Sequence, residues 1–222
     1  MTVIATMSYE ITTPRLTIRS ATKSDAAFLL QLHSDPADAE MRVFRDPAQS
    51  LAAFEQRTVD WANTAAEGKN RFMVIVVKSS SPGFDSLDCP ISHDGKLIGM
   101  TGFNVIEYAP DQESPHIDRG AKIEEIDVGV HTLPEAAGWG WGREALAAVV
   151  DYAFELGSKS ILMETMAVNK KFIAFCAKIG LDKYSRSRMD EKHGEERIYR
   201  FDRAAWEEAK RNWPVHVGVR SV

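Results

Sequence analysis

One segment constrains the fold of this chain more than any other. The stretch KIEEIDVGVHTL (122–133) alternates apolar and polar residues closely enough to be a strand. GWGWGREAL (138–146) follows, and it runs into a segment, 143–157, whose apolar residues recur at helical spacing. A second strand pattern follows at 160–168. These elements predict one βαβ unit, whose crossover should be right-handed.

The rest of the chain predicts an antiparallel sheet to which this unit is attached. Further strands are expected at 15–21, 71–78, 96–108, 181–189 and 196–202, and further helices at 22–35, 47–68, 169–180 and 203–213. The fold class is therefore α+β, with a mixed, mostly antiparallel central sheet flanked by helices. We expect a single domain over 11–213, with terminal extensions at 1–10 and 214–222.

Composition excludes several classes of protein. Hydrophobic residues make up 44% and charged residues 27% of 222 residues, as in ordinary globular domains. The net charge of -5 argues against a nucleic-acid partner. Cys89 and Cys176 lie far apart without a CxxC spacing, so no metal is expected. The N-terminal residues do not resemble a signal peptide, and no apolar run is long enough to cross a membrane, so we expect a cytoplasmic protein. Met7 is an alternative first residue.

The glycine turn has the chemistry of an anion site. The first N–H groups of a helix lack intrahelical partners, and the helix dipole adds partial positive charge there. Glycines let this backbone approach a phosphate closely, and Arg143 adds a full positive charge. The turn lacks the GxxxxGK pattern of a Walker loop, and its place after several strands disfavours a Rossmann site. A plain turn with Trp139 and Trp141 in the core remains an alternative.

Four segments, in the same order, resemble the GCN5-related N-acetyltransferases (GNATs), in the branch that contains the ribosomal-protein N-terminal acetyltransferases. They are TPRLTIRSATKSDAAFLLQLHSDP, IDVGVHTLPEAAGWGWGREAL, VNKKFIAFCAKIGL and RIYRFDRAAWEEA. The first resembles the opening strand and helix, and the second the acetyl-CoA motif. The third resembles the asparagine-led helix that follows, and the fourth the closing strand with its Trp. The resemblance spans roughly residues 11–210.

The resemblance implies that the βαβ unit binds acetyl-CoA as the acetyl donor. The implied binding residues are Gly138, Trp139, Gly140, Trp141, Gly142 and Arg143 around the pyrophosphate, and the backbone of Val128, Val130 and Thr132 along the pantetheine arm. Trp141 stands where the family often has Tyr, and Trp139 is expected at the surface, shielding the coenzyme. Glu135 and Ala137 depart from the Gln or Arg frequent in the motif, a loss of charge that Arg143 would offset.

Acetyl transfer by direct attack of an amine on the thioester needs a base, an oxyanion donor and a proton for the thiolate. The base candidates are Glu124, Glu125 and Asp127. Strand alternation puts Glu124 on one face and the other two on the opposite face. Asp127 matches the acidic residue of the Glu-Ile-Gly-Tyr-like segment of this branch. Alternatively these are solvated strand charges, and water relays the proton.

The proton donor is the least defined part of the predicted site. Cys176 occupies a position where many family members have Tyr, but it also lies on an apolar helix stripe, which is typical of a small core residue. Tyr184 or bulk water are the alternatives. Asn169 would bind the coenzyme or order a catalytic water, unless it only caps the following helix.

The acceptor is expected to be a small-molecule or peptide amine. Loops 79–95 and 109–121 carry Asp85, Asp88, Glu113 and Asp118. If these loops border the acceptor site, they favour a cationic acceptor such as a protein N-terminus, a polyamine-like amine or an aminosugar. A monomer or a homodimer is expected, the latter if 215–222 pairs as a strand. Two other functions stay open: a CoA-binding module without turnover, and an acyltransferase for longer acyl chains.

Overall fold

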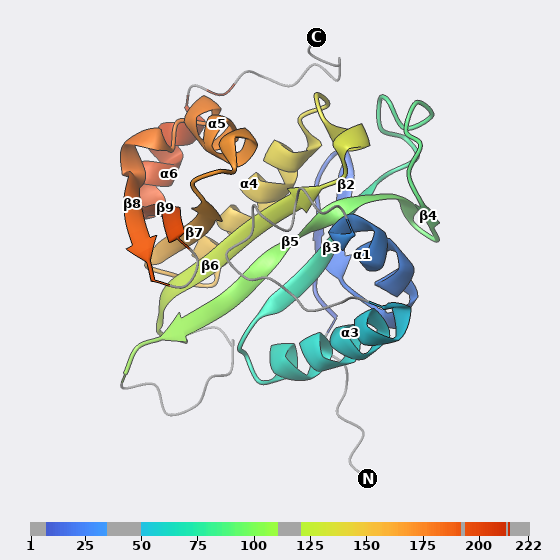
Figure 1. The fold of residues 1–222 in the computed structure, drawn as a ribbon, viewed down its shortest axis with the longest axis horizontal. Coiled ribbons are helices and arrows are strands. Elements are labelled where there is room, and N and C mark those ends of the chain that lie inside the picture. The colour runs from blue at the N-terminus through green and yellow to red at the C-terminus, as the bar shows by residue number, and fades with distance from the viewer. Residues whose placement is uncertain (1–7, 35–49, 111–120, 192–193, 212, 214–222) are drawn as a thin grey trace.

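The computed structural model describes residues 8–34, 50–110, 121–191, 194–211 and 213 (Figure 1). The strands are β1 (Glu10–Thr12), β2 (Leu16–Ser20), β3 (Arg71–Val77), β4 (Ile91–Ser92), β5 (Gly95–Tyr108), β6 (Ile123–Thr132), β7 (Ser160–Met166), β8 (Ser185–Asp190) and β9 (Gly194–Phe201). The helices are α1 (Ala26–His33), α3 (Leu51–Ala66), α4 (Trp141–Glu155), α5 (Lys170–Lys178) and α6 (Arg203–Lys210).

The strands form one mixed sheet in the order β1-β2-β3-β5-β6-β7-β9-β8, with β4 paired to β5 outside this path. Within the described residues only β6 and β7 pair in parallel, and the other paired strands are antiparallel. The α+β prediction, with α4 as the crossover between two parallel strands, is therefore confirmed. The sequence patterns missed β1 and β4, which are too short to show a period. Glu10 belongs to β1, although 1–10 was expected to be an extension.

Helices cover the two faces of the sheet unequally. α4 lies behind the sheet, and α1 and α3 lie in front of its β2–β3 half (Figure 1). The core between the layers contains Trp141, Phe54 and Phe103, none of which is exposed. Burial of each such side chain contributes roughly 1.5–3 kcal/mol. Of the described helices, none lies in front of β6, β7 and β9, so this part of the sheet can carry a site (Figure 1).

The two parallel strands diverge halfway along β6. Their pairing comprises Glu125 with Ser160, Ile126 with Ile161 and Asp127 with Leu162. On its other side β6 stays paired with β5 as far as Thr132. Beyond Asp127, the backbone of β6 therefore forms no strand pairing with β7 along this edge. An extended ligand could form backbone hydrogen bonds with this edge.

Candidate active site

The glycine turn has the backbone geometry that the sequence predicts for an anion site. Gly138 and Gly140 have φ angles of 86° and 76°, in the left-handed region that side chains with a Cβ rarely adopt. Gly140 is the N-cap of α4, and no side chain caps this helix. The first N–H groups of α4 therefore lack both intrahelical partners and a capping side chain.

Two details of the turn differ from the prediction. The helix begins at Trp141 rather than at 143, because the chain enters the helical conformation directly after the left-handed Gly140. Trp139, expected at the surface, is instead partly buried. Its ring stacks on Trp141 at 5.2 Å and lies against Gly83, where an added Cβ would approach the ring to 2.4 Å. Trp139 therefore helps to fix the turn from the side of the loop that contains Gly83.

The turn is also anchored to the connection between β1 and β2. The Arg15 guanidinium donates to the Trp139 carbonyl at 3.0 Å and forms an ion pair with Glu144 at 2.6 Å. The Thr13 hydroxyl donates to the same Glu144 carboxylate at 2.6 Å. Glu144 lies in the first turn of α4. These contacts hold the helix N-terminus in one position relative to β2.

Positive charge gathers at this helix N-terminus. Burial and the neighbouring Arg15 lower the pKa of Arg143. The Nη2 atom of Arg15 is buried and has no hydrogen-bond partner among the described residues. Together with the left-handed glycines, the uncapped helix and the free edge of β6, the charge of Arg143 and the Nη2 donor of Arg15 fit a ligand such as coenzyme A, in which a pyrophosphate precedes an extended arm.

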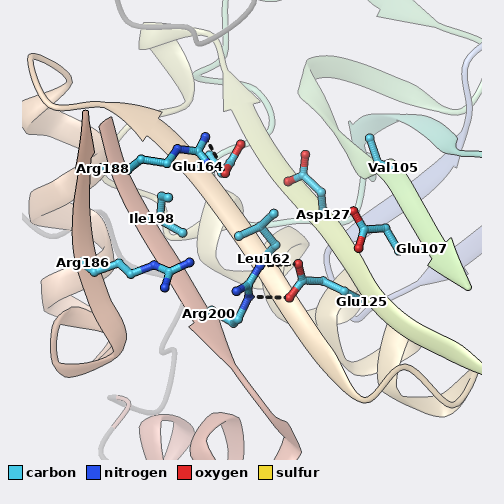
Figure 2. Close-up of a pocket in the computed structure, with 10 residues that line it drawn as sticks. All are labelled: Val105, Glu107, Glu125, Asp127, Leu162, Glu164, Arg186, Arg188, Ile198 and Arg200. Atoms are coloured by element: carbon cyan, nitrogen blue, oxygen red, sulfur yellow. Dashed lines mark hydrogen bonds and ion pairs between the residues drawn. The ribbon is translucent and has the colours of Figure 1, made fainter. Parts of the chain in front are cut away.

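A pocket of about 300 Å³ lies on the front of the sheet (Figure 2). It is lined by Val105, Glu107, Glu125, Asp127, Leu162, Glu164, Arg186, Arg188, Ile198 and Arg200. These residues come from five strands, β5 to β9. Asp127 stands beside the point where β6 leaves β7, so the pocket adjoins the free edge of β6. Within the described chain, the glycine turn and the pocket lie at opposite ends of one strand segment.

Asp127 is the most perturbed carboxyl group in this pocket. Burial, together with the nearby Glu164, Glu125 and Glu107, raises its pKa to about 7, although a hydrogen bond from Asn104 opposes the shift. The Asn104 amide donates to Asp127 over 3.3 Å. Asn104 occupies a bulge in β5, and it packs so closely on Gly129 that a Cβ there would lie 3.2 Å from the amide nitrogen. Gly129 thus leaves the space in which Asn104 reaches Asp127.

The other predicted base candidates lie apart from one another, as strand alternation predicted. Glu125 lines the pocket, where Arg200 binds its carboxylate with two hydrogen bonds of 2.6 and 2.8 Å. Glu124 is not among the lining residues, and its carboxylate pairs with Lys159. A carboxylate outside the pocket cannot remove a proton from a substrate bound inside it. Asp127 is therefore the base candidate with the most suitable surroundings.

Cys176 and Asn169 both serve structural roles here. The side chain of Cys176 is completely buried, and this burial raises the pKa of its thiol to about 12. Such a thiol lies away from any solvent-accessible leaving group, as expected for the core alternative. Asn169 caps α5 by accepting from the Phe172 amide at 3.1 Å, and it donates to Thr165 at 2.9 Å. Tyr184 donates to Glu208 instead of facing the pocket.

The acidic loop 79–95 does not provide the carboxylates of the pocket. Gly83 contacts Trp139, and Lys96 donates to the carbonyls of Phe84 and Leu87, so the loop packs beside the glycine turn. Neither Asp85 nor Asp88 lines the pocket. Glu113 and Asp118 lie outside the described residues, as do 214–222. The carboxylates near Asp127 come from strands instead, and the alternation of Glu107 and Glu164 with apolar neighbours was the signal that could have identified them.

The described residues offer neither a metal site nor a membrane-spanning helix. No cluster of three or more His, Cys, Asp or Glu side chains suited to a metal ion occurs in the described parts of the chain. None of the described helices has the length and apolar character needed to cross a membrane. Both cysteines are buried and form no disulfide.

Comparison with known proteins identifies the family to which a chain with this fold and glycine turn belongs. Residues 15–182 match the model of the acetyltransferase (GNAT) domain. The chain therefore belongs to the GNAT acetyltransferase family, as the sequence resemblance implied. No curated protein matches it in sequence.

Solved structures agree on the fold. An acetyltransferase from Salmonella typhimurium that modifies the N-terminal serine of ribosomal protein L7/L12 has a TM-score of 0.64 at 13% identity, covering 87% of this chain and 99% of that one. FdhC, a nucleotide-linked sugar GNAT, has a TM-score of 0.62 at 16% identity, covering 92% and 96%. The microcin C7 self-immunity acetyltransferase MccE, solved with acetyl-CoA and AMP, has a TM-score of 0.61 at 13% identity, covering 86% and 93%.

Proposed function

We propose that this protein is an acetyl-CoA-dependent N-acetyltransferase whose acceptor is a cationic primary amine and whose general base is Asp127. One observation carries the proposal. Asp127 lines a pocket at the point where β6 leaves β7, and its pKa is about 7. A base with this pKa is substantially ionised at neutral pH and still accepts a proton readily.

The coenzyme would be held by the residues that the family resemblance names. The turn from Gly138 to Arg143 would bind the pyrophosphate, and backbone groups of Val128, Val130 and Thr132 would bind the pantetheine arm. Bound acetyl-CoA would supply an acetyl thioester activated for attack by an amine. The free edge of β6 and the uncapped α4 support this assignment.

Asp127 would accept the proton that the acceptor ammonium must lose before its nitrogen can form the new N–C bond. A backbone N–H of β6 next to Asp127 would donate to the carbonyl oxygen as negative charge develops on it. After the N–C bond forms, the nitrogen would lose its second proton to water, the C–S bond would break, and the thiolate would take a proton from water, because the Cys176 thiol is buried. Glu107, which has no ion pair among the described residues, favours a cation in the pocket, and burial together with the nearby carboxylates keeps the pKa of Asp127 high.

The test is a kinetic comparison of Asp127→Asn with the matched variant Glu124→Gln. Each removes one carboxylate from β6, but only Asp127 lines the pocket. Release of free thiol from acetyl-CoA is measured with a panel of amines from pH 5 to 9. We expect Asp127→Asn to lower kcat/KM by about 10²–10⁴-fold and to abolish an acid limb near pH 7, with Glu124→Gln within about twofold of wild type.

Three results would contradict the proposal or a part of it. Wild-type protein that binds acetyl-CoA in a calorimeter but acetylates no amine would be a coenzyme-binding module without turnover. Turnover only of acceptors that lack a protonated amino group would refute the cationic amine. Equal losses in the two variants would remove Asp127 from the role of base.

A further inference from the structure

The pocket around Asp127 has walls of opposite charge. Glu107, Glu125 and Asp127 extend from β5 and β6 on one side, and Arg186, Arg188 and Arg200 extend from β8 and β9 on the other (Figure 2). Leu162 and Ile198 lie between the two walls. The pocket is therefore dipolar, with an apolar strip between its acidic and basic sides.

Two of the three arginines are already neutralised by neighbouring carboxylates. Arg200 binds Glu125 with two hydrogen bonds. Arg188 contacts both Glu164, at 3.1 Å, and the buried Glu196, at 2.6 Å, so that this group of three carries a net negative charge. Neither arginine offers an uncompensated positive charge to a ligand.

The charges that remain lie on opposite walls. Among the described residues, neither Glu107 nor Asp127 on the acidic wall forms an ion pair. Arg186, on the basic wall, forms no ion pair with a described residue either. The Arg186 side chain points from β8 toward the pocket (Figure 2). A ligand that satisfied both walls would need a positive group for Asp127 and Glu107 and a negative group for Arg186.

We propose that the acceptor is an amine that also carries an anionic group, a carboxylate or a phosphate, bound by Arg186. This inference rests on the proposed function and narrows its substrate class. A polyamine would place further positive charge near Arg186, whereas a zwitterionic acceptor pairs with both walls. Charge-assisted hydrogen bonds from a guanidinium to carboxylate or phosphate are among the stronger contacts that proteins form.

The strand order sets the separation of the two groups on the acceptor. β6 and β8 are separated by β7 and β9, and neighbouring strands lie about 4.8 Å apart, so the backbones of Asp127 and Arg186 are at least about 14 Å apart. The long arginine side chain spans much of that distance. The amine and the anion of the acceptor should therefore be several bonds apart rather than on adjacent atoms.

The experiment compares matched acceptors that differ only in the anionic group. One arm uses γ-aminobutyrate and its amide, and the other uses glucosamine phosphate and glucosamine. Each acceptor is assayed with wild type, with Arg186→Gln, and with Lys23→Gln, which removes one positive charge from an exposed site outside the pocket. Far-ultraviolet circular dichroism checks that each variant is folded.

We expect wild type to prefer the anionic member of at least one pair by about tenfold or more in kcat/KM. Arg186→Gln should remove that preference through KM and leave the neutral member within about twofold. Preference in the first arm indicates a carboxylate, and in the second a phosphate. Equal use of both members in every pair, or a preference that survives Arg186→Gln, would overturn this inference alone. Turnover of no amine would overturn the proposed function and this inference together.

Discussion

The glycine turn and the Asp127 pocket lie toward opposite ends of β6 and are built in different ways. The turn uses consecutive residues, and its key property is the left-handed backbone of Gly138 and Gly140. The pocket uses two side chains from each of five strands, and its key property is the distribution of their charges. The backbone conformation of the turn depends on residues that are adjacent in sequence. The charge distribution of the pocket depends on which strands become neighbours in the sheet.

This difference implies that the two regions respond differently to substitution. The turn should be sensitive to a change that adds bulk or charge at Gly138 or Gly140, because few other residues adopt their left-handed backbone conformation. The pocket should be sensitive to charge and less sensitive to shape, because it is open to solvent. Coenzyme binding, stability and pH dependence can test this contrast separately.

The largest effect is expected for Gly140→Asp. A negative side chain at the N-cap would repel the pyrophosphate, so we expect acetyl-CoA affinity to fall by about 1,000-fold, equivalent to about 4 kcal/mol. The variant should fold, because aspartate tolerates the left-handed region better than most residues and a negative charge suits a helix N-terminus. Isothermal titration calorimetry measures the loss.

Gly142→Ala is the matched control for this prediction. Its added Cβ would meet Thr132 at 3.7 Å, an ordinary contact, and the position lies within α4 rather than at a left-handed φ. We expect its affinity to stay within about threefold of wild type. If the two variants lose affinity equally, crowding of the turn explains the result, and the special role of Gly140 is refuted.

The sequence predicts the turn well and the pocket poorly, for the same physical reason. Gly138 and Gly140 are visible as neighbours, and the alternation of β6 placed Asp127 and Glu125 on one face. Trp139 was misplaced because its partner, Gly83, lies in a distant loop. Arg186 and Glu107 are also distant in sequence, and only the order of β5 to β9 brings them to one pocket. The bulge at Asn104 has no sequence signal, since it arises from a register shift between paired strands.

A smaller effect is expected on the stability of Asp127→Asn. The pKa of this carboxyl group is about 7 in the folded protein and about 3.9 when unfolded, so the folded state binds the proton more tightly. Ionisation therefore costs the folded state nothing below about pH 4, progressively more up to pH 7, and a constant amount above it. Asparagine cannot ionise, so the variant should be more stable than wild type above pH 7.

The gain should be about 2 kcal/mol at pH 8, which is below the full value of the shift because the group is partly exposed to solvent. Urea denaturation at pH 5 and pH 8 measures it, and the difference between variant and wild type should be smaller at pH 5. Glu124→Gln should show no such pH dependence. A variant less stable than wild type at pH 8 would mean that ionised Asp127 stabilises the folded protein. That result would contradict a catalytic base whose burial costs stability.

The smallest effect is expected for Asn104→Ala. Its amide donates to Asp127 and lowers the pKa of that carboxyl group, against the larger influence of burial. Loss of the hydrogen bond should move the acid limb of the kcat/KM profile to higher pH while leaving the rate at high pH within about threefold of wild type. Thr101→Ser is a suitable control, since it keeps the hydroxyl bond to the Gly129 carbonyl on the same strand pair. A limb that moves to lower pH, or an equal fall in rate at every pH, would show that Asn104 acts on the acceptor or the backbone instead of on the ionisation of Asp127.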